Sequence, residues 1–449
     1  MKHVDTICAL ASGPPPAALI VLRVSGPAVA EFMAQHLQPS PTNPRRAVLS
    51  RLINTEGETV DEGLAVWMPG PKSYTGDDTL ELTLHGGQVI LEEALAVMLA
   101  FPGIRLAEPG EFTRRAFESG AMDLTQAEAV ADLIDAETKG QKEQALRQMS
   151  GAFGDVYRGW RGQILDLMVL AESVIDFPDE EDAPKRVEAP MRQKLDELIR
   201  EFQHTLKDNA IGERVRDGFQ IAILGAPNAG KSTLLNRITK RDAAIVSDIA
   251  GTTRDTVEVR LKLAGQLVTL VDTAGLRETM DPIELEGIRR AHRAGKQSDL
   301  AIILQNGAML EPQDVLSGQT LHVWNKSDIE SPTFAIEPSE PLGSGDRPFV
   351  ISAKTGDGID ALISHLEQWL KSKTQNIETA IITRARHRDS LTQALGHLTR
   401  ALARIDQIGV DELVGEDLRL AARDLGCIIG DVGVEDVLGA IFSQFCIGK

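Results

Sequence analysis

The chain has 449 residues and a formal net charge of −19, with 47 lysine and arginine residues against 66 aspartate and glutamate residues. This length exceeds one hydrophobic core, so we expect about two to four domains. An acidic chain lacks the basic footprint of a protein that grips nucleic acid alone, so an RNA substrate would need a partner or a local basic patch. Three cysteines, Cys8, Cys427 and Cys446, argue against a disulfide framework and favour a reducing cytoplasm. No segment approaches a transmembrane span, so no membrane association is expected.

The residue pattern divides the chain into an N-terminal region, a helical region and an inserted α/β region. Short strand-like runs stand at 20–24, 64–68 and 79–84. They predict a small α+β domain over 1–119. Apolar stripes at helical spacing in 120–214 and 374–449 predict two parts of one helical domain. Strands alternate with helices over 215–373, as in a doubly wound, mainly parallel sheet. The predicted fold class is therefore multidomain α/β plus α, with the 215–373 domain inserted into the helical domain.

Residues 225–232, Gly-Ala-Pro-Asn-Ala-Gly-Lys-Ser, fit the phosphate-binding loop G-x-x-x-x-G-K-[ST]. The apolar run 219–224 before them predicts a buried strand, and 232–236 predicts the first turn of a helix. Glycines let backbone N–H groups surround phosphate oxygens. Lys231 is placed to reach the β- and γ-phosphates, and Ser232 to coordinate Mg²⁺. An ordinary glycine-rich turn is the plain alternative, and the strand–loop–helix context disfavours it.

Four further segments predict a GTPase rather than a general nucleotide-binding protein. Thr253, in a Gly-Thr-Thr-Arg-Asp segment, is placed to close over the γ-phosphate and its Mg²⁺. Asp272 suits an outer Mg²⁺ contact, and the Gly275 N–H suits the γ-phosphate. Asp328 can accept two hydrogen bonds that guanine offers and adenine does not, which selects GTP over ATP. The Ser-Ala-Lys segment at 352–354 would complete the base pocket.

The usual water-orienting glutamine of Ras-like enzymes is missing, because Leu276 stands in its place. Another group must orient the attacking water. The nearby charged candidates are Arg277, Glu278, Asp281, Glu284 and Glu286. From the residues alone, each of them is more often a solvated loop charge.

Several segments outside the GTPase region add to the pattern, and two of them, the Asp-Leu-Thr-Gln-Ala-Glu run and the terminal tetrapeptide, are much more specific than the phosphate-binding loop. The segments are 73–78 (Ser-Tyr-Thr-Gly-Asp-Asp), 85–87 (His-Gly-Gly), 109–113 (Pro-Gly-Glu-Phe-Thr), 123–129 (Asp-Leu-Thr-Gln-Ala-Glu-Ala) and 446–449 (Cys-Ile-Gly-Lys). Together with the GTPase segments, they make the whole chain resemble the bacterial MnmE (TrmE) family of tRNA-modification GTPases. The resemblance implies K⁺-activated GTP hydrolysis, a homodimer formed through tetrahydrofolate-binding N-terminal domains, and a flavin-dependent, MnmG-like partner in a heterotetramer.

The same resemblance implies the reaction. A carboxymethylaminomethyl-type group would be added to C5 of the wobble uridine of certain tRNAs, with 5-formyl- or 5,10-methylene-tetrahydrofolate as the one-carbon donor. The partner would supply much of the tRNA-binding surface. The alternative is a ribosome-assembly GTPase without modification chemistry, which shares the phosphate-loop asparagine and the Gly-Thr-Thr-Arg segment. Such proteins usually carry a KH-type RNA-binding domain, and the helical C-terminal pattern does not predict one.

Residue roles follow from the resemblance. Glu284 would orient the attacking water, and Cys446 would be either a nucleophile toward uridine C6 or a buried terminal thiol. Mg²⁺ would be held by Ser232 and Thr253. The expected K⁺ ligands are Asn228, Ser247, Ile249 and Thr252. The tetrahydrofolate positions are Arg23, Glu81, Ala121 and Lys449, with Ala121 where the family usually has lysine. The expected GTP contacts are Asn228, Ala229, Gly230, Lys231, Ser232, Thr233, Ser247, Thr253, Asp272, Gly275, Asn325, Lys326, Asp328, Ser352, Ala353 and Lys354.

Overall fold

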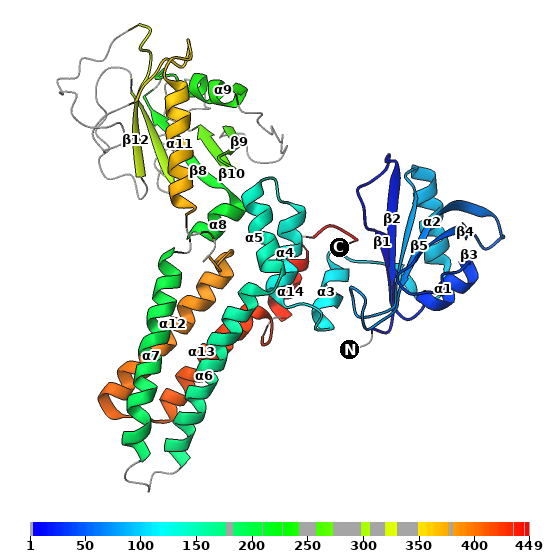
Figure 1. Cartoon of the computed structure of the whole chain (residues 1–449), viewed down its shortest axis with the longest axis horizontal. Coiled ribbons are helices and arrows are strands. Elements are labelled where there is room, and N and C mark those ends of the chain that lie inside the picture. The colour runs from blue at the N-terminus through cyan, green and yellow to red at the C-terminus, as the bar shows by residue number, and fades with distance from the viewer. Residues whose placement is uncertain are drawn as a thin grey trace, which may run out of the picture. The chain divides into compact units, whose positions relative to one another are not determined.

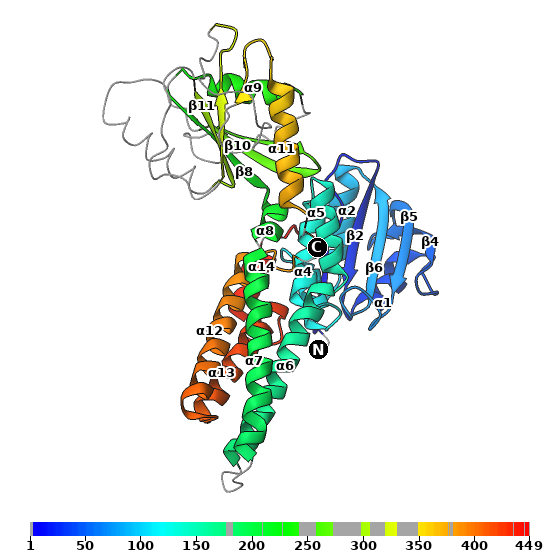
Figure 2. The same ribbon diagram turned by 60° about the vertical axis from the view of Figure 1, so that its left-hand side comes forward.

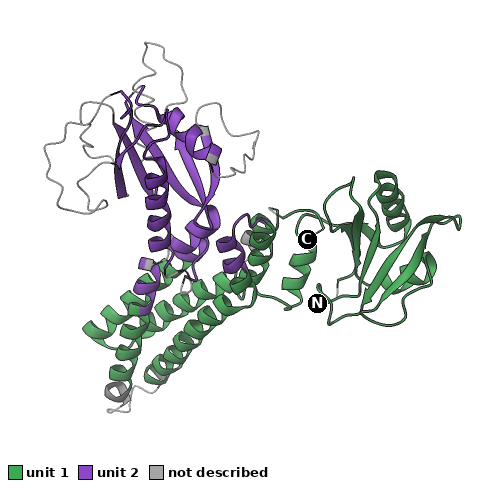
Figure 3. Cartoon of the chain, turned by 45° about the horizontal axis from the view of Figure 1, so that its top comes forward, with its two compact units in different colours: residues 1–134, 146–200, 389–449 green, residues 135–145, 201–388 purple. Residues whose placement is uncertain are grey.

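The computed structural model divides the chain into two compact units (Figure 3). Unit 1 comprises Met1–Ile134, Leu146–Arg200 and Asp389–Lys449, and unit 2 comprises Asp135–Ala145 and Glu201–Arg388. The structure describes residues 3–176, 183–208, 210–226, 228–241, 257–272, 298–305, 319–329, 349–375, 377, 380–433, 435–443 and 445–448. The four-part division at 119, 214 and 373 stays a prediction.

The N-terminal part of unit 1 is built on a seven-stranded sheet in the order β3-β4-β5-β6-β2-β1-β7. Its elements are β1 (Thr6–Leu10), β2 (Leu19–Ser25), α1 (Val29–His36), β3 (Leu37–Gln38), β4 (Ala47–Ile53), β5 (Thr59–Met68), β6 (Thr79–His85), α2 (Gln88–Ala100), β7 (Ile104–Leu106) and α3 (Glu111–Glu118). Only the β1–β7 pair is parallel among these described strands.

Period-two alternation explains how this sheet buries one face. Ile20, Leu22 and Val24 of β2 are fully buried, and so are alternate residues of β6. Helices α1 and α2 cover that face with side chains such as Phe32 and Ala94 (Figures 1 and 2). The three predicted strands at 20–24, 64–68 and 79–84 lie within β2, β5 and β6. The sheet therefore holds β2 and β6 side by side, with the opposite face left for polar side chains.

The rest of unit 1 is helical. Its helices, some of which continue into unit 2, are α4 (Leu124–Ile134), α5 (Lys139–Met149), α6 (Ala152–Asp176), α7 (Ala183–Asp208), α12 (Ala385–Ile408), α13 (Glu412–Ile429) and α14 (Glu435–Phe442). A capping box forms before α4, because the Gln126 backbone N–H donates to Asp123 Oδ1 at 2.9 Å and Gln126 Oε1 accepts from the Asp123 backbone N–H. The apolar stripe of α13 is buried, and this helix packs along α6.

Unit 2 contains a six-stranded sheet in the order β13-β12-β11-β8-β10-β9. Its elements are α8 (Ala210–Asp217), β8 (Phe219–Gly225), α9 (Lys231–Arg241), β9 (Val257–Leu263), β10 (Gln266–Asp272), β11 (Leu300–Gln305), β12 (Gln319–Trp324), β13 (Phe349–Val350) and α11 (Ile359–Lys373). The described strand pairs are parallel except for β9 with β10, as predicted for this region. In such a sheet, ligands bind beyond the carboxyl ends of the strands.

The carboxyl ends of the strands in this sheet are held in place by buried residues of the central strands. Ile221 and Ile223 of β8 and Ile302 and Leu304 of β11 have no solvent exposure. They share one hydrophobic core with the inward face of α11. The loops after β8, β12 and β13 therefore lead outward from a rigid core. Within the described part of the chain, no helix combines the length and apolar character needed to cross a membrane.

Candidate functional site

The phosphate-binding loop leaves β8 at Gly225 and enters α9 at Lys231. Gly225 has φ 156° and Gly230 has φ 97°, a backbone region that side chains disfavour. A Cβ at Gly225 would stand 2.5 Å from the Leu304 carbonyl oxygen, and one at Gly230 would collide with Asn325 Nδ2. Both positions therefore require glycine, because neighbouring residues of the fold lie too close for a Cβ and because the φ angles disfavour a side chain.

Lys231 lies mostly buried within the loop that it ends. Its Nζ donates to the carbonyl oxygens of Gly225 at 2.7 Å and Ala226 at 2.9 Å. These bonds hold the ammonium group inside the curve of the loop, where it would meet phosphate oxygens. Ser232 and Thr233 follow on the first turn of α9 and are exposed. The loop thus combines a fixed cation, a hydroxyl group and the N-terminus of a helix, which suits an anionic ligand.

Asn325 joins three segments that are far apart in the sequence. Its Nδ2 donates to the Ala229 carbonyl oxygen at 2.7 Å, and its Oδ1 accepts from the Ala353 N–H at 2.9 Å. The side chain is 3% exposed. One buried amide therefore connects the phosphate-binding loop, the end of β12 and the loop after β13. This connection assembles the residues expected to bind phosphate and base into one site.

Asp328 is held by a second contact in the same region. Ser352 Oγ donates to Asp328 Oδ1 at 2.7 Å, and the Asp328 side chain remains exposed. Its carboxylate is thus oriented while it can still be reached by a ligand. Lys326 has φ 66°, and Lys354 is exposed beside Ala353. Arg237 of α9 supports that segment by donating to the carbonyl oxygens of Ala353 and Lys354.

Asp272 comes from a neighbouring strand. It is the last residue of β10 and pairs in register with Ile223 of β8, two residues before the phosphate-binding loop. Asn228, within that loop, has φ 60° and is exposed. The structure thus brings Asp272 and Asn228 to the edge where the loop begins. The other predicted residues of this site lie outside the described residues: Ser247, Ile249, Thr252, Thr253, Gly275 and Glu284.

A second polar site lies on the N-terminal sheet. Arg23 of β2 faces Glu81 of β6 in register, with Nη2 2.8 Å from Oε1. The Arg23 guanidinium carbon is 5.3 Å from the Tyr74 ring centroid and 5.5 Å from that of Phe112. Two aromatic rings therefore restrict Arg23 while its side chain remains 20% exposed. A cation and a carboxylate held side by side suit a ligand with both an acidic tail and N–H donors.

The C-terminal tail returns to this N-terminal sheet. Ile447 bridges Pro109, and the Gly110 N–H donates to the Cys446 carbonyl oxygen at 3.5 Å. Gly448, with φ 100°, lies so close to the Leu10 carbonyl oxygen that a Cβ would collide with it. Leu10 follows the β1 residue that pairs with Arg23, so the tail ends near the second site. Lys449 lies outside the described residues.

Two predicted residues of this region have clear surroundings. Cys446 is exposed, so the alternative of a buried terminal thiol is wrong. Its position, with the tail held at both neighbours, follows from tertiary contacts that no local pattern predicts. Ala121 is also exposed, and its N–H donates to the Ala116 carbonyl oxygen at 3.0 Å, which ends α3.

Two family models together match almost the whole chain. The MnmE helical domain model matches residues 124–446, and the model for the N-terminus of the GTP-binding protein TrmE matches residues 6–121. The chain belongs to the MnmE family of tRNA modification GTPases. The predicted resemblance and fold class are thereby confirmed.

Full-length relatives agree with this assignment. A tRNA modification GTPase MnmE from Hyphomonas neptunium is 50% identical over 447 residues, 99% of each chain. One from Rhodopseudomonas palustris is 45% identical over 446 residues, again 99% of each chain. Among solved structures, the G domain of the T. maritima FeoB iron transporter aligns with 34% of this chain and 98% of its own. Its identity is 20% and its TM-score is 0.26.

The sequence patterns do not predict one ion-pair network of this MnmE-family chain, which is centred on Glu111. Glu111 accepts from Arg105 Nη2 at 2.6 Å and from Arg115 Nη2 at 2.8 Å, and it also accepts from the Glu108 N–H. Burial by itself would raise the pKa of Glu111, but these hydrogen bonds outweigh it and lower the pKa to about 2. Asp5, which directly precedes β1, accepts hydrogen bonds from both Arg105 and Arg115. The Pro-Gly-Glu-Phe-Thr segment signalled this network, because its glutamate fixes α3 to the sheet.

Proposed function

We propose that this chain hydrolyses GTP in support of tRNA modification, together with a flavin-dependent, MnmG-like partner. The observation that carries the proposal is the Asn325 bridge between the phosphate-binding loop and the Ala353 segment. It connects a phosphate cradle with a base pocket in one rigid arrangement. Family membership supports the tRNA-modification role.

Guanine selection would rest on Asp328. A carboxylate there accepts hydrogen bonds from guanine N1 and the 2-amino group, and adenine leaves it unpaired. The Ser352 hydroxyl supports this role because it holds one carboxylate oxygen in place. The remaining contacts would come from backbone and side chains of Asn325, Lys326, Ala353 and Lys354 around the base, and from Ala229, Gly230 and Thr233 around the phosphates.

Two metal ions belong to the proposal. The loop from Gly225 to Gly230, which curves around the Lys231 ammonium group, fits a triphosphate. Ser232 and Thr253 would hold Mg²⁺. The K⁺ ion would be held by Asn228, Ser247, Ile249 and Thr252, and the exposed, left-handed Asn228 is suited to presenting its side chain there. Bound cations supply positive charge at the γ-phosphate, where negative charge develops.

The chain's own residues would complete the reaction site. Lys231 would contact the phosphates from inside the loop, and Asp272 would support Mg²⁺ from the end of β10. Glu284 would orient the attacking water, which supplies the function that Leu276 lacks. The Gly275 N–H would contact the γ-phosphate. These roles rest on the family resemblance and on the position of β10 beside β8.

The one-carbon donor would bind on the N-terminal sheet. Arg23 or Lys449 would pair with the glutamate tail of a tetrahydrofolate, and Glu81 would accept pterin N–H bonds. The packing of the tail against Leu10 supports a contribution from its terminal lysine. The exposure of Cys446 is compatible with attack on uridine C6, and such attack requires the thiolate form.

The proposed product is a wobble uridine that carries a carboxymethylaminomethyl-type group at C5. The proposed assembly is a homodimer joined through N-terminal domains and bound to the partner as a heterotetramer. The net charge of −19 supports a division in which the partner supplies much of the tRNA surface. A cytoplasmic location is part of the proposal, supported by the low, odd cysteine count.

The test is mass-spectrometric nucleoside analysis of tRNA from cells that lack this chain. We expect loss of C5-aminomethyl-type wobble uridines, restored by the wild-type chain. Glu284→Ala should fail to restore them, and Glu286→Ala, which removes a nearby carboxylate, should restore them. An unchanged nucleoside profile in the deletion strain would overturn the modification function and favour the ribosome-assembly alternative.

A further inference from the structure

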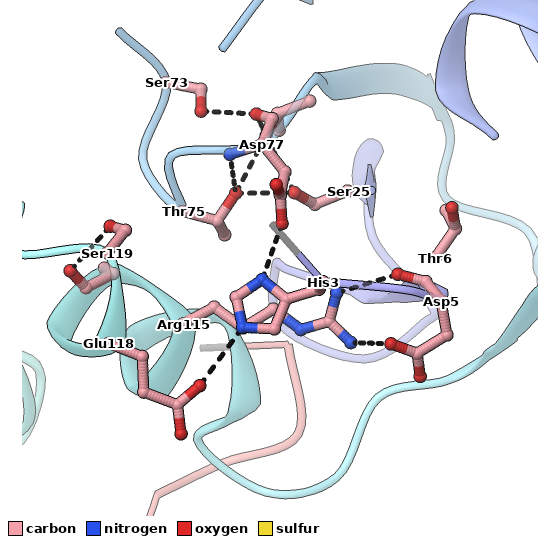
Figure 4. Close-up of polar contacts among 12 residues, drawn as sticks. His3, Asp5, Thr6, Ser25, Ser73, Thr75, Asp77, Arg115, Glu118 and Ser119 are labelled. Atoms are coloured by element: carbon pink, nitrogen blue, oxygen red, sulfur yellow. Dashed lines mark hydrogen bonds and ion pairs between the residues drawn. The ribbon is translucent and has the colours of Figure 1, made fainter. Parts of the chain in front are cut away.

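The loop over residues 73–78, between β5 and β6, is bound by a histidine from outside the sheet (Figure 4). His3 Nδ1 lies 2.7 Å from Asp77 Oδ2, and His3 Nε2 lies 3.1 Å from Glu118 Oε2 at the end of α3. The His3 side chain is 17% exposed. We call these three residues the His3 clasp. It connects the loop with α3 by means of one imidazole ring.

The clasp places one carboxylate oxygen against each ring nitrogen of His3. Ionised carboxylates only accept hydrogen bonds, so they suit a partner that can donate in two directions. Without it, Asp77 and Glu118 would be two negative charges close to the same point, and they would repel each other. Arg114 also donates to Glu118, with Nε 2.8 Å from Oε1. Among the described contacts, His3 is therefore the link between the two carboxylates.

Buried contacts also hold the 73–78 loop against the sheet and α3. The Ser25 and Thr75 hydroxyl oxygens are 2.6 Å apart in the buried interior, and Ser73 Oγ donates to the Asp77 carbonyl oxygen. Gly76 has φ 84°, and a Cβ there would stand 2.7 Å from Ser119 Cβ. The loop thus has little space to move toward α3. Motion in the opposite direction, away from α3, is what the His3 clasp opposes.

Tyr74 connects this loop to the second site. Its ring lies 5.3 Å from the Arg23 guanidinium carbon, and its hydroxyl oxygen is 2.9 Å from Thr113 Oγ1 of α3. Burial raises the pKa of the Tyr74 phenol, which agrees with a ring held inside the fold. A loop displaced from α3 would carry Tyr74 away from both partners. Arg23 would then lose one of the two rings that restrict it.

We propose that His3 is a positioning residue for the Arg23–Glu81 site, acting through the loop and Tyr74. The inference rests on the proposed folate-binding function. His3 would not touch the ligand. It would fix the loop that fixes Arg23, so its loss would weaken binding at the N-terminal sheet and leave the GTP site unchanged.

The binding test uses the full chain and 5-formyltetrahydrofolate as the probe in calorimetric titration. We expect His3→Ala to weaken binding by about tenfold or more. His3→Lys should restore binding to within about threefold, since one ammonium group offers three donors to the two carboxylates. His204→Ala, which removes an exposed histidine on α7, should bind as the wild type does. Affinity for GTP should be the same in all four proteins.

A second measurement needs no ligand. Amide hydrogen exchange over residues 73–78 should be faster in His3→Ala, return to the wild-type rate in His3→Lys and stay unchanged in His204→Ala. If His3→Ala alters neither this exchange nor folate affinity, the inference is wrong. If the wild type binds no folate, the folate part of the proposed function fails, and the exchange data alone decide whether His3 positions the loop.

Discussion

Replacement of Asn325 by alanine tests the central feature of the nucleotide site. The side chain is 3% exposed and makes two hydrogen bonds, one to the Ala229 carbonyl oxygen and one from the Ala353 N–H. Its removal leaves two buried backbone groups without that partner, at about 1–3 kcal/mol each. We expect a total loss of about 2–6 kcal/mol, divided between folding of unit 2 and assembly of the base pocket.

The assay is the dissociation constant for a fluorescent guanine nucleotide, measured alongside urea unfolding of the full chain. If about 3 kcal/mol of this loss falls on the free energy of nucleotide binding, the dissociation constant rises roughly 100-fold. Asn325→Asp should be no better than alanine, because a carboxylate cannot donate to the Ala229 carbonyl oxygen. Asn236→Ala is the matched control, since Asn236 is exposed on α9 of the same unit.

The outcome that refutes this reasoning is specific. The reasoning fails if Asn325→Ala binds nucleotide within about twofold of the wild type and also unfolds at the same urea concentration. A loss of about 2 kcal/mol would change at least one of these two measurements by more than that. That result would mean that the phosphate-binding loop and the Ala353 segment hold their positions without the amide. The proposed function would then lose the observation on which it chiefly rests.

Three further predictions concern separate parts of the chain. Asp328→Asn should weaken GTP binding about 100-fold, because two charge-assisted hydrogen bonds are lost, and it should improve binding of xanthosine triphosphate. Competition titrations with the two nucleotides measure both effects. Equal loss for both nucleotides would contradict the role of Asp328 in base selection. The pKa of Glu111 is lowered to about 2 from an ordinary 4.5, so its stabilisation is present above about pH 4.5 and is lost as pH falls toward 2. Glu111→Gln should therefore lower the free energy of unfolding at pH 7, by up to about 3 kcal/mol, and the difference from wild type should shrink between pH 5 and 3 in denaturant titrations; a constant difference would contradict it. Gly448→Ala should displace the tail from Leu10 and speed carboxypeptidase trimming, whereas Gly439→Ala, where nothing lies within 4 Å, should not, and equal trimming rates would refute the close packing.

Local sequence patterns were sufficient for much of the fold. The alternation at Ile20, Leu22 and Val24 predicts a strand with one buried face, and the structure confirms it. The apolar stripe of α13 lies in the 374–449 region, where helical spacing predicts such stripes, and it is buried in the structure. These succeed because a side chain's direction within a helix or strand depends on backbone geometry a few residues away. The strand–loop–helix order around Lys231 is equally local.

Contacts across long separations were decided by tertiary structure. Asn325 reaches Ala229 only because the sheet order places β12 next to β11 and β11 next to β8. His3 meets Asp77 and Glu118, separated from it by 74 and 115 residues, because loop and helix pack together.

The sequence alone determined the family, the phosphate-binding loop and most elements, because each is encoded in contiguous residues whose chemistry is readable in order. Only the tertiary structure decided that Asn325 bridges two halves of a pocket, that the tail reaches Leu10 and that Cys446 is exposed. Such contacts depend on strand order and helix packing. These are properties of the whole buried core, and no short segment contains them.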